Sequence, residues 1–311
     1  MEKYPIVSVV TPSYNQGKFL EKTIVSIISQ EGNFYLQYLV MDGGSGDESV
    51  EIIRKYEQII KENRFPLKCR GIIEYTWLSG PDEGQSSAIN KGLKMARGEI
   101  IGWLNSDDTY LPGTIGKVVD ELRVHPDVSL IYGNCNFIDQ GDSLIKTWNT
   151  GLFSKKILSR FCPIAQPAAF FRDKTIREVG LLNPSLHFAM DYEFWIRIFK
   201  KGLVVKKINV VLANYRLYPE CKSFSGYAGI GELLWIVFQH FKCNFSRTFK
   251  TYILQFNKER KTGLKTARDF LASEMLKCEK EKSKSSLKGY ILRGYLLARL
   301  EYFALKFFQK T

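Results

Sequence analysis

The sequence IIGWLNSDD, residues 100–108, decides the fold because an apolar run stops abruptly at two adjacent carboxylates. The tripeptide LPG follows at 111–113, and Pro112 suits the first turn of a new helix, where its missing N–H costs nothing. Asp107 and Asp108 are therefore expected at the C-terminal end of a buried strand, where open α/β sheets bind ligands. Adjacent carboxylates repel each other, and Mg²⁺ or Mn²⁺ would relieve that repulsion. A solvated helix N-terminus, which favours Asp through the helix dipole, is the alternative explanation.

Upstream of this stretch, apolar strands alternate with amphipathic helices. Residues 6–10, IVSVV, are a β-branched run typical of a strand buried on both faces. Strand patterns recur at 38–41 and 72–78, with helical spacing of apolar residues between the strands. The alternation predicts an α/β fold with a mostly parallel sheet flanked by helices.

Polar loops follow each of the first four expected strands, at 11–17, 42–47, 82–85 and 105–108. In a parallel sheet these loops gather along one edge. Each contains a carboxylate or an amide, so a ligand cleft explains them better than four separate turns. The first loop fits neither a P-loop nor the G-x-G-x-x-G pattern, which argues against a P-loop NTPase and a dinucleotide dehydrogenase.

The composition indicates a globular protein. The chain has 311 residues, 45% of them hydrophobic, which is enough for a sizeable core. Its six cysteines form no Cys-x-x-Cys pair, so we expect reduced thiols in a cytoplasmic protein. The N-terminus shows no signal peptide pattern, and no apolar run reaches the roughly 18 residues of a membrane span.

Positive charge is concentrated in the last third of the chain. Residues 220–311 hold 18 of the 45 Lys and Arg but only 8 of the 32 Asp and Glu. Aromatic and aliphatic residues alternate with these lysines on expected helices, a pattern found in helices that lie on anionic membranes. Packing against the rest of the chain or a second subunit is the competing interpretation, and no nucleic-acid recognition motif accompanies the charge.

A second candidate carboxylate lies in FAMDYEFWIRI, residues 188–198. Phe194, Trp195 and Ile198 form a helical stripe, which places Asp191 at or near the helix N-cap. A capping side chain there would contribute about 1 kcal/mol. Capping and catalysis are compatible because an Asp at this position projects beyond the helix end.

Five motifs occur together in an order and spacing that resemble family 2 glycosyltransferases of the GT-A fold, the inverting nucleotide-sugar enzymes that build bacterial polysaccharides. The motifs are TPSYN at 11–15, DGGS at 42–45, D-x-G at 82–84 with A-x-N-x-G at 88–92, NSDD at 105–108 and MDY at 190–192. The resemblance covers about residues 4–222. It predicts a GT-A catalytic domain over 1–222 and a basic, helical C-terminal extension over 223–311.

The resemblance also implies roles for individual residues. The nucleotide base and ribose would contact a set of β-strand and loop residues: Thr11, Pro12, Tyr14, Asp42 and Asp82, with Asn90 in support. Asp107 would contact the nucleotide and Asp108 would hold Mn²⁺ or Mg²⁺ on the diphosphate. Asp191 matches the general base of the family. Gln166 stands where such enzymes often present polar groups near the acceptor.

Two positions depart from the pattern of the family. The usual Glu-Asp pair reads Met190-Asp191 here, so the flanking carboxylate is missing. Tyr218 stands where relatives often carry a metal-binding His, and none of His125, His187 and His240 replaces it. Tyr218 is a poor neutral ligand, so the cation would depend on Asp108, diphosphate oxygens and water.

The expected function is therefore metal-dependent, inverting transfer of a sugar from a nucleotide-diphosphate donor. The reaction would be of the hexosyltransferase type, and UDP is the expected nucleotide. The acceptor would be a hydroxyl of a saccharide or of a polyprenyl-diphosphate-linked sugar in cell-surface polysaccharide synthesis. This predicts a cytoplasmic protein on the inner face of the membrane; a homo-oligomer is left open and nucleic acid is not expected as a partner. The alternatives are a catalytically weak nucleotide-sugar-binding scaffold and a nucleotidyltransferase. Residues 11–17 hold no Arg or Lys, which disfavours the nucleotidyltransferase.

Overall fold

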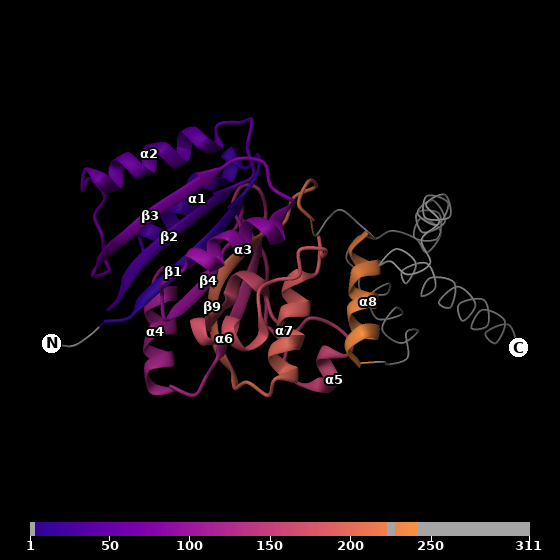
Figure 1. Ribbon diagram of the computed structural model, residues 1–311. Coiled ribbons are helices and arrows are strands. Elements are labelled where there is room, and N and C mark those ends of the chain that lie inside the picture. The colour runs from indigo at the N-terminus through magenta and orange to yellow at the C-terminus, as the bar shows by residue number, and fades with distance from the viewer. Residues whose placement is uncertain (1–3, 223–227, 242–311) are drawn as a thin grey trace, which may run out of the picture. The chain divides into compact units, whose positions relative to one another are not determined.

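The computed structural model describes residues 4–222 and 228–241 (Figure 1). The chain divides into two compact units, Met1–Phe153 with Pro163–Tyr218 and Ser154–Cys162 with Pro219–Thr311. The first unit contains the sheet and every candidate site residue. The predicted domain boundary between residues 222 and 223 stays a prediction, because most of the expected extension lies outside the described residues.

The described elements follow the predicted alternation through the first four strands. In chain order they are β1 (Ile6–Ser13), α1 (Gly17–Ile28), β2 (Tyr35–Asp42), α2 (Ser49–Lys61), β3 (Gly71–Ser79), α3 (Gln85–Met95), β4 (Ile100–Trp103), β5 (Thr109–Tyr110), α4 (Thr114–Val124), β6 (Leu130–Ile138), β7 (Leu144–Trp148), α5 (Lys155–Leu158), the 3-10 helix η1 (Gln166–Ala168), β8 (Ala169–Arg172), α6 (Asp173–Val179), α7 (Met190–Lys200), β9 (Val205–Arg216) and α8 (Ala228–Phe241).

One mixed sheet carries all of these strands, in the order β3-β2-β1-β4-β8-β6-β9-β5, with β7 paired to β6. The pairs among β3, β2, β1 and β4 are parallel, as predicted. Beyond β4 the sheet changes character: β8 is antiparallel to both β4 and β6, and only the β6–β9 pair is parallel. The acidic stretch after β4 therefore lies at the border between the parallel and mixed halves.

Both faces of the parallel half are covered by helices. Val7 and Val9 of β1 pack into the core cluster that contains Leu20 and Ile24 of α1. The opposite face of β1 lies against α3, where a Cβ added at Gly92 would come within 2.4 Å of Val10 Cγ1. Only glycine allows α3 to approach the sheet this closely. Because successive side chains of β1 point to opposite faces of the sheet, β1 packs against α1 on one face and against α3 on the other.

The chain after Asp108 differs from the sequence-based expectation. Pro112 does not begin a helix; it lies in a turn, and α4 starts at Thr114 after Gly113, which has a φ of 71°. Before that turn, Thr109 and Tyr110 form β5, which pairs with β9. This short strand was not predicted, since two residues carry no periodicity and the pairing depends on a strand about a hundred residues downstream.

Beyond α4 the strands no longer alternate regularly with helices. β6 runs from Leu130 to Ile138, and η1 directly precedes β8. The apolar run at 233–238 lies in α8, and the basic segment beyond Phe241 is outside the described residues. Among the helices that the structure describes, none is long and apolar enough to cross a bilayer.

Candidate active site

The carboxyl ends of β1, β2, β3 and β4 meet at one edge of the sheet. Parallel pairing sets Ser13 opposite Asp42, and Asp42 in turn opposite Ser79. On the other side of β1, the N–H of Leu104 donates to the carbonyl of Val10 at 3.0 Å. The four polar loops named from the sequence therefore lie along this edge, as expected from the topology.

Asp42 organises the loop after β2. Its carboxylate is buried and accepts hydrogen bonds from the Ser79 hydroxyl at 2.7 Å and from the Ser45 hydroxyl at 2.5 Å. The backbone N–H groups of Gly44 and Ser45 also donate to it. Four donors, two hydroxyls and two backbone N–H groups, therefore satisfy this buried carboxylate. The side chain thus fixes the shape of the loop.

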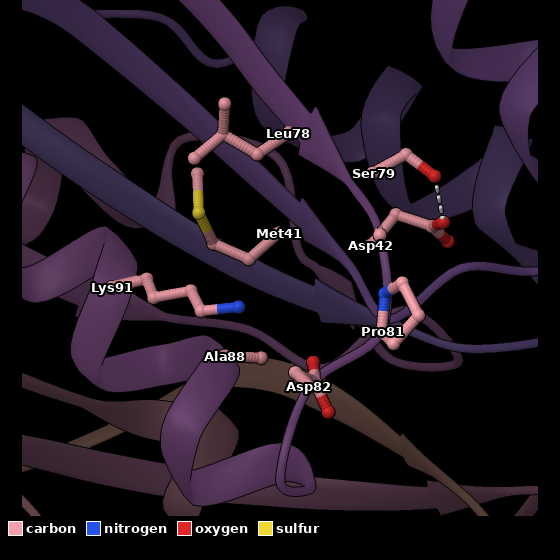
Figure 2. Close-up of a pocket in the computed structure, with 9 residues that line it drawn as sticks. Met41, Asp42, Leu78, Ser79, Pro81, Asp82, Ala88 and Lys91 are labelled. Atoms are coloured by element: carbon pink, nitrogen blue, oxygen red, sulfur yellow. Dashed lines mark hydrogen bonds between the residues drawn. The ribbon is translucent and has the colours of Figure 1, made fainter.

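A pocket of about 150 Å³ lies beside Asp42 (Figure 2). Met41, Leu78 and Ala88 form its apolar part, and Asp42 and Asp82 contribute carboxylates. In Figure 2 the side chain of Lys91, from α3, directs its ammonium into the space bounded by Met41 and Ala88. Lys91 was not predicted from the sequence, because a lysine on the surface of a helix carries no signal of its own.

The three candidate residues from the end of β1 and the loop after it differ in exposure and therefore in whether they could contact a ligand: Thr11, Pro12 and Tyr14. Thr11 and Pro12 are buried within β1, and the Thr11 hydroxyl accepts from the Tyr38 hydroxyl at 3.2 Å. Tyr14 is exposed and lies next to Gly43, where an added Cβ would meet Tyr14 Cδ2 at 3.3 Å and Asp82 Oδ2 at 3.2 Å. Tyr14 and Asp82 therefore both lie against Gly43 in the loop after β2.

Asp107 and Asp108 have different environments although they are adjacent. Asp108 is 1% exposed, and its Oδ1 accepts from the backbone N–H of Arg216 at 2.8 Å. Its Oδ2 is buried without a hydrogen-bond partner among the described residues. Burial, and then the charge of Asp107, raise the pKa of Asp108 well above its usual range. The structure therefore buries the carboxyl that was expected to hold the cation.

The Asp107 side chain is partly exposed instead. Its Oδ2 accepts from the hydroxyl of Tyr218 at 2.8 Å, and the Tyr218 oxygen accepts from Gln16 Nε2 at 3.1 Å. These contacts join the loop after β4 to the loop after β1 and to the chain after β9. Neither Gln16 nor the link to Tyr218 was predicted, because the residues involved are about 90 and 110 positions from Asp107.

Arg216 fixes the backbone beneath the two carboxylates. Its side chain is fully buried; Nε donates to the carbonyl of Asp107 at 2.8 Å and Nη1 to the carbonyl of Asp139 at 2.9 Å. The guanidinium also forms an ion pair with Asp142 at 2.6 Å and stacks over the Phe19 ring at 4.7 Å. Burial raises the pKa of Asp142, but hydrogen bonds from Lys22 and Arg216 outweigh it, so the net shift is downward.

An amide network lies on the other side of the loop after β4. Asn105 Oδ1 accepts from Gln85 Nε2 at 2.8 Å and from Trp103 Nε1 at 2.9 Å, and its Nδ2 donates to Gln166 Oε1 at 3.2 Å. Gln166 Nε2 donates to the carbonyl of Trp103 at 2.6 Å. Gln166, expected near the acceptor, is buried and uses both ends of its amide within the protein. The network connects α3, β4 and η1.

Asp191 is the second residue of α7, after Ala189 at the N-cap position. It is half-buried, and its Oδ1 accepts from the N–H of Tyr192 at 2.7 Å. The next acidic residue, Glu193, is buried and makes two 3.0 Å contacts with Arg197 Nε, which gives it a structural role.

The chain that leads into α7 is held against α3 and the Asp82 loop. Asn90 exchanges two hydrogen bonds of 2.9 Å with the backbone of Leu182, and the Ser86 hydroxyl donates to the carbonyl of Leu186 at 2.8 Å. A Cβ added at Gly84 would lie 3.8 Å from His187 Nδ1. Asn90 thus supports the approach to Asp191 and does not itself line the pocket beside Asp42.

The carboxylates at this edge of the sheet fit a cation site that is completed by phosphate oxygens of a substrate. Within the described residues, no three side chains among His, Cys, Asp and Glu come together as a metal site. Mg²⁺ is usually held by one or two carboxylates together with the phosphates of its substrate. One partly exposed carboxylate, Asp107, in the loop after β4 meets that requirement.

The fold is shared with solved glycosyltransferase structures of the GT-A type. Residues 1–349 of TarS from S. aureus, in complex with UDP-GlcNAc, match with a TM-score of 0.58 at 14% identity, over 96% of this chain and 91% of that one. A mannosyltransferase from Pyrobaculum calidifontis, in complex with GDP-Man and Mn²⁺, matches with a TM-score of 0.55 at 13% identity, over 96% and 88%. At these identities the likeness shows the fold.

The family follows from the sequence comparison. Residues 8–197, more than half of the chain, match glycosyl transferase family 2, and the chain belongs to this family. An uncharacterized glycosyltransferase of Methanocaldococcus jannaschii is 26% identical over 68% of this chain and 71% of that protein. The chondroitin synthase of Escherichia coli is 27% identical over 72% of this chain, which spans only 30% of that protein.

Proposed function

We propose that this protein is a metal-dependent inverting glycosyltransferase that uses a nucleotide-diphosphate sugar, with UDP as the preferred carrier. The observation that carries the proposal is the gathering of Asp42, Asp82 and Asp107 at one sheet edge in a chain of this family. The pocket beside Asp42 would take the base and ribose. Lys91 supports a keto base, because an ammonium donates to carbonyl oxygens and uracil presents two of them.

Asp107, and not Asp108, is the residue that we assign to the divalent cation. The assignment rests on the contrast between a partly exposed carboxylate and a neighbour that is 1% exposed and whose pKa is raised by burial. A cation bound there, Mn²⁺ or Mg²⁺, would stabilise the negative charge of the leaving diphosphate. Asp108 would have a supporting role, holding the backbone of Arg216 through its N–H.

Asp191 is the residue that we assign as general base. It would take the proton of the acceptor hydroxyl while that oxygen bonds to the anomeric carbon and the bond to the diphosphate breaks. A single displacement of this kind inverts the configuration. Its place near the start of α7, next to the segment held against α3, supports this role, as does the resemblance to the family motif.

A hydroxyl of a saccharide, free or carried on a polyprenyl diphosphate, is the acceptor class that we propose. The similarity to a chondroitin synthase supports a role in polysaccharide synthesis. The excess of Lys and Arg over Asp and Glu in residues 220–311 supports contact with an anionic membrane on the cytoplasmic side, where lipid-linked acceptors lie.

The proposal is tested by incubating the full chain with UDP-, dTDP- and GDP-sugars in the presence of Mn²⁺, Mg²⁺ or EDTA and measuring release of the nucleoside diphosphate. We expect cation-dependent release from a UDP-sugar, accelerated by a lipid-linked saccharide. Nucleotide-sugar binding without release under any condition would instead indicate a scaffold. No binding of any nucleotide sugar would overturn the proposal.

A further inference from the structure

A chain of hydrogen bonds leads from Gln16 to the Asp107 carboxylate. The Tyr218 oxygen lies 2.8 Å from Asp107 Oδ2 and 3.1 Å from Gln16 Nε2. The Tyr218 side chain is 7% exposed, and its ring packs against the Phe19 ring with centroids 5.0 Å apart. Ring packing and both hydrogen bonds hold the hydroxyl in place.

The direction of these hydrogen bonds follows from the single proton of a phenol. Gln16 Oε1 is also within reach of the Tyr218 hydroxyl, at 3.3 Å. A carboxylate is a stronger acceptor than an amide oxygen, so the proton goes to Asp107. The Gln16 amide then donates to the phenol oxygen, and the order is Gln16 to Tyr218 to Asp107.

This arrangement suits Tyr218 to orienting the Asp107 carboxylate and not to binding the cation itself. A neutral phenol whose proton is directed at a carboxylate is a poor ligand for Mg²⁺ or Mn²⁺, which prefer carboxylate, carbonyl and water oxygens. Its hydroxyl can, however, restrict the rotation of the Asp107 side chain. Groups that orient a metal-binding carboxylate in this way typically change metal affinity 10- to 100-fold when removed.

We infer that Tyr218 is a positioning residue: its hydroxyl, itself oriented by Gln16, holds the Asp107 carboxylate in the orientation that meets the cation on the donor diphosphate. The inference rests on the proposed function. It predicts that the Tyr218 hydroxyl acts on the cation-dependent part of nucleotide binding and has little effect on the part that needs no cation.

The chain offers a matched control for the test. Tyr56 is also 7% exposed, and its hydroxyl also donates to a carboxylate, Glu21 Oε1, at 3.0 Å. This pair joins α1 and α2 and does not include a candidate site residue. Tyr56→Phe and Tyr218→Phe therefore remove the same kind of hydrogen bond from equally buried rings, and both keep the ring in place.

The experiment is calorimetric titration of UDP, dTDP and GDP into the full chain with Mn²⁺ and with EDTA. The readout is the ratio of the two affinities for the nucleotide that the wild type binds best. We expect Tyr218→Phe to lower this ratio 10- to 100-fold and Gln16→Leu to lower it less. Tyr56→Phe should leave the ratio unchanged. Raising the Mn²⁺ concentration should restore nucleotide binding to Tyr218→Phe.

The outcomes distinguish this inference from the proposed function. Cation-dependent binding by the wild type, together with an equal or larger ratio in Tyr218→Phe, would overturn the inference and leave the proposed function standing. An equal fall of the ratio in Tyr56→Phe would also overturn it, since the effect would then be one of general stability. A wild type without cation-dependent binding of any of the three nucleotides would overturn both.

Discussion

Replacing Arg216 by Met should destabilise the protein strongly, because the buried guanidinium joins three segments of the chain. Its Nε and Nη1 donate to the carbonyls of Asp107 and Asp139, and Nη1 pairs with Asp142. Methionine fills a similar volume but provides no donor, so two carbonyls lose their hydrogen bonds. Hydrogen bonds to a charged group contribute about 1.5–3 kcal/mol each.

The size of the effect can be estimated from this environment. Removing one partner of a buried ion pair costs about 3–5 kcal/mol when the other charge stays buried. Asp142 is 41% exposed and can be solvated, so we expect the loss at the lower end, about 3 kcal/mol. At about 2–4 °C per kcal/mol for a domain of this size, the melting temperature should fall by roughly 6–12 °C.

The assay is urea denaturation of Arg216→Met followed by tryptophan fluorescence, with Asp142→Asn as the matched variant. Asp142→Asn keeps the guanidinium and its two carbonyl contacts, and it loses the ion pairs of a partly exposed carboxylate with Arg216 and Lys22, each worth about 0–1 kcal/mol. We expect a large loss in the first variant and a small one in the second. A loss below about 1 kcal/mol in Arg216→Met would refute the structural role given to the guanidinium.

Three further predictions address the helix layer, the buried acid and the general base. Gly92→Ala should cost about 1–3 kcal/mol by overpacking, because its Cβ would meet Val10 at 2.4 Å; equal urea midpoints for the variant and the wild type would contradict this close contact. The pKa of Asp108 is raised in the folded state, so the folded protein binds the extra proton and stability falls as pH rises above the unfolded pKa of Asp. In thermal melts with EDTA, the difference in melting temperature between Asp108→Asn and the wild type should therefore increase in favour of the variant from pH 4 to pH 8. A difference that does not change with pH would argue against the raised pKa of Asp108. Asp191→Asn should retain nucleotide-sugar binding and lose transfer, and an active variant would remove Asp191 from the mechanism.

The parallel half of the fold could be predicted because each of its strands has a recognisable local residue pattern. The run at 6–10 is β-branched and buried on both faces, and helical spacing between strands predicts the covering helices. The mixed half could not be predicted, since its strands gain their order from long-range pairing. β5 consists of Thr109 and Tyr110 alone and exists because β9 passes beside it.

The site follows the same division. Asp42, Asp82 and the Asp107–Asp108 pair could be identified from the ends of apolar runs, and the topology brings them to one edge. Which member of the pair faces outward could not be predicted, because it depends on the N–H of Arg216, 108 positions away.

The hydrogen bonds of the residues around the acidic pair could not be predicted from the sequence either. Gln166 and Asn105 look like free polar side chains in the sequence, yet the fold uses their amides to bind each other and Trp103. The hydrogen bond from Tyr218 to Asp107 likewise depends on the fold, since the two residues are 111 positions apart.

The most direct test of the central claim compares Mn²⁺ binding by the wild type, Asp107→Asn and Asp108→Asn in the presence of UDP, with electron paramagnetic resonance of free Mn²⁺ as the readout. If Asp107 holds the cation, Asp107→Asn should lose UDP-dependent Mn²⁺ binding while its melting temperature stays close to that of the wild type, and Asp108→Asn should retain binding wherever it is folded. Binding that survives in Asp107→Asn and disappears in folded Asp108→Asn would contradict the account.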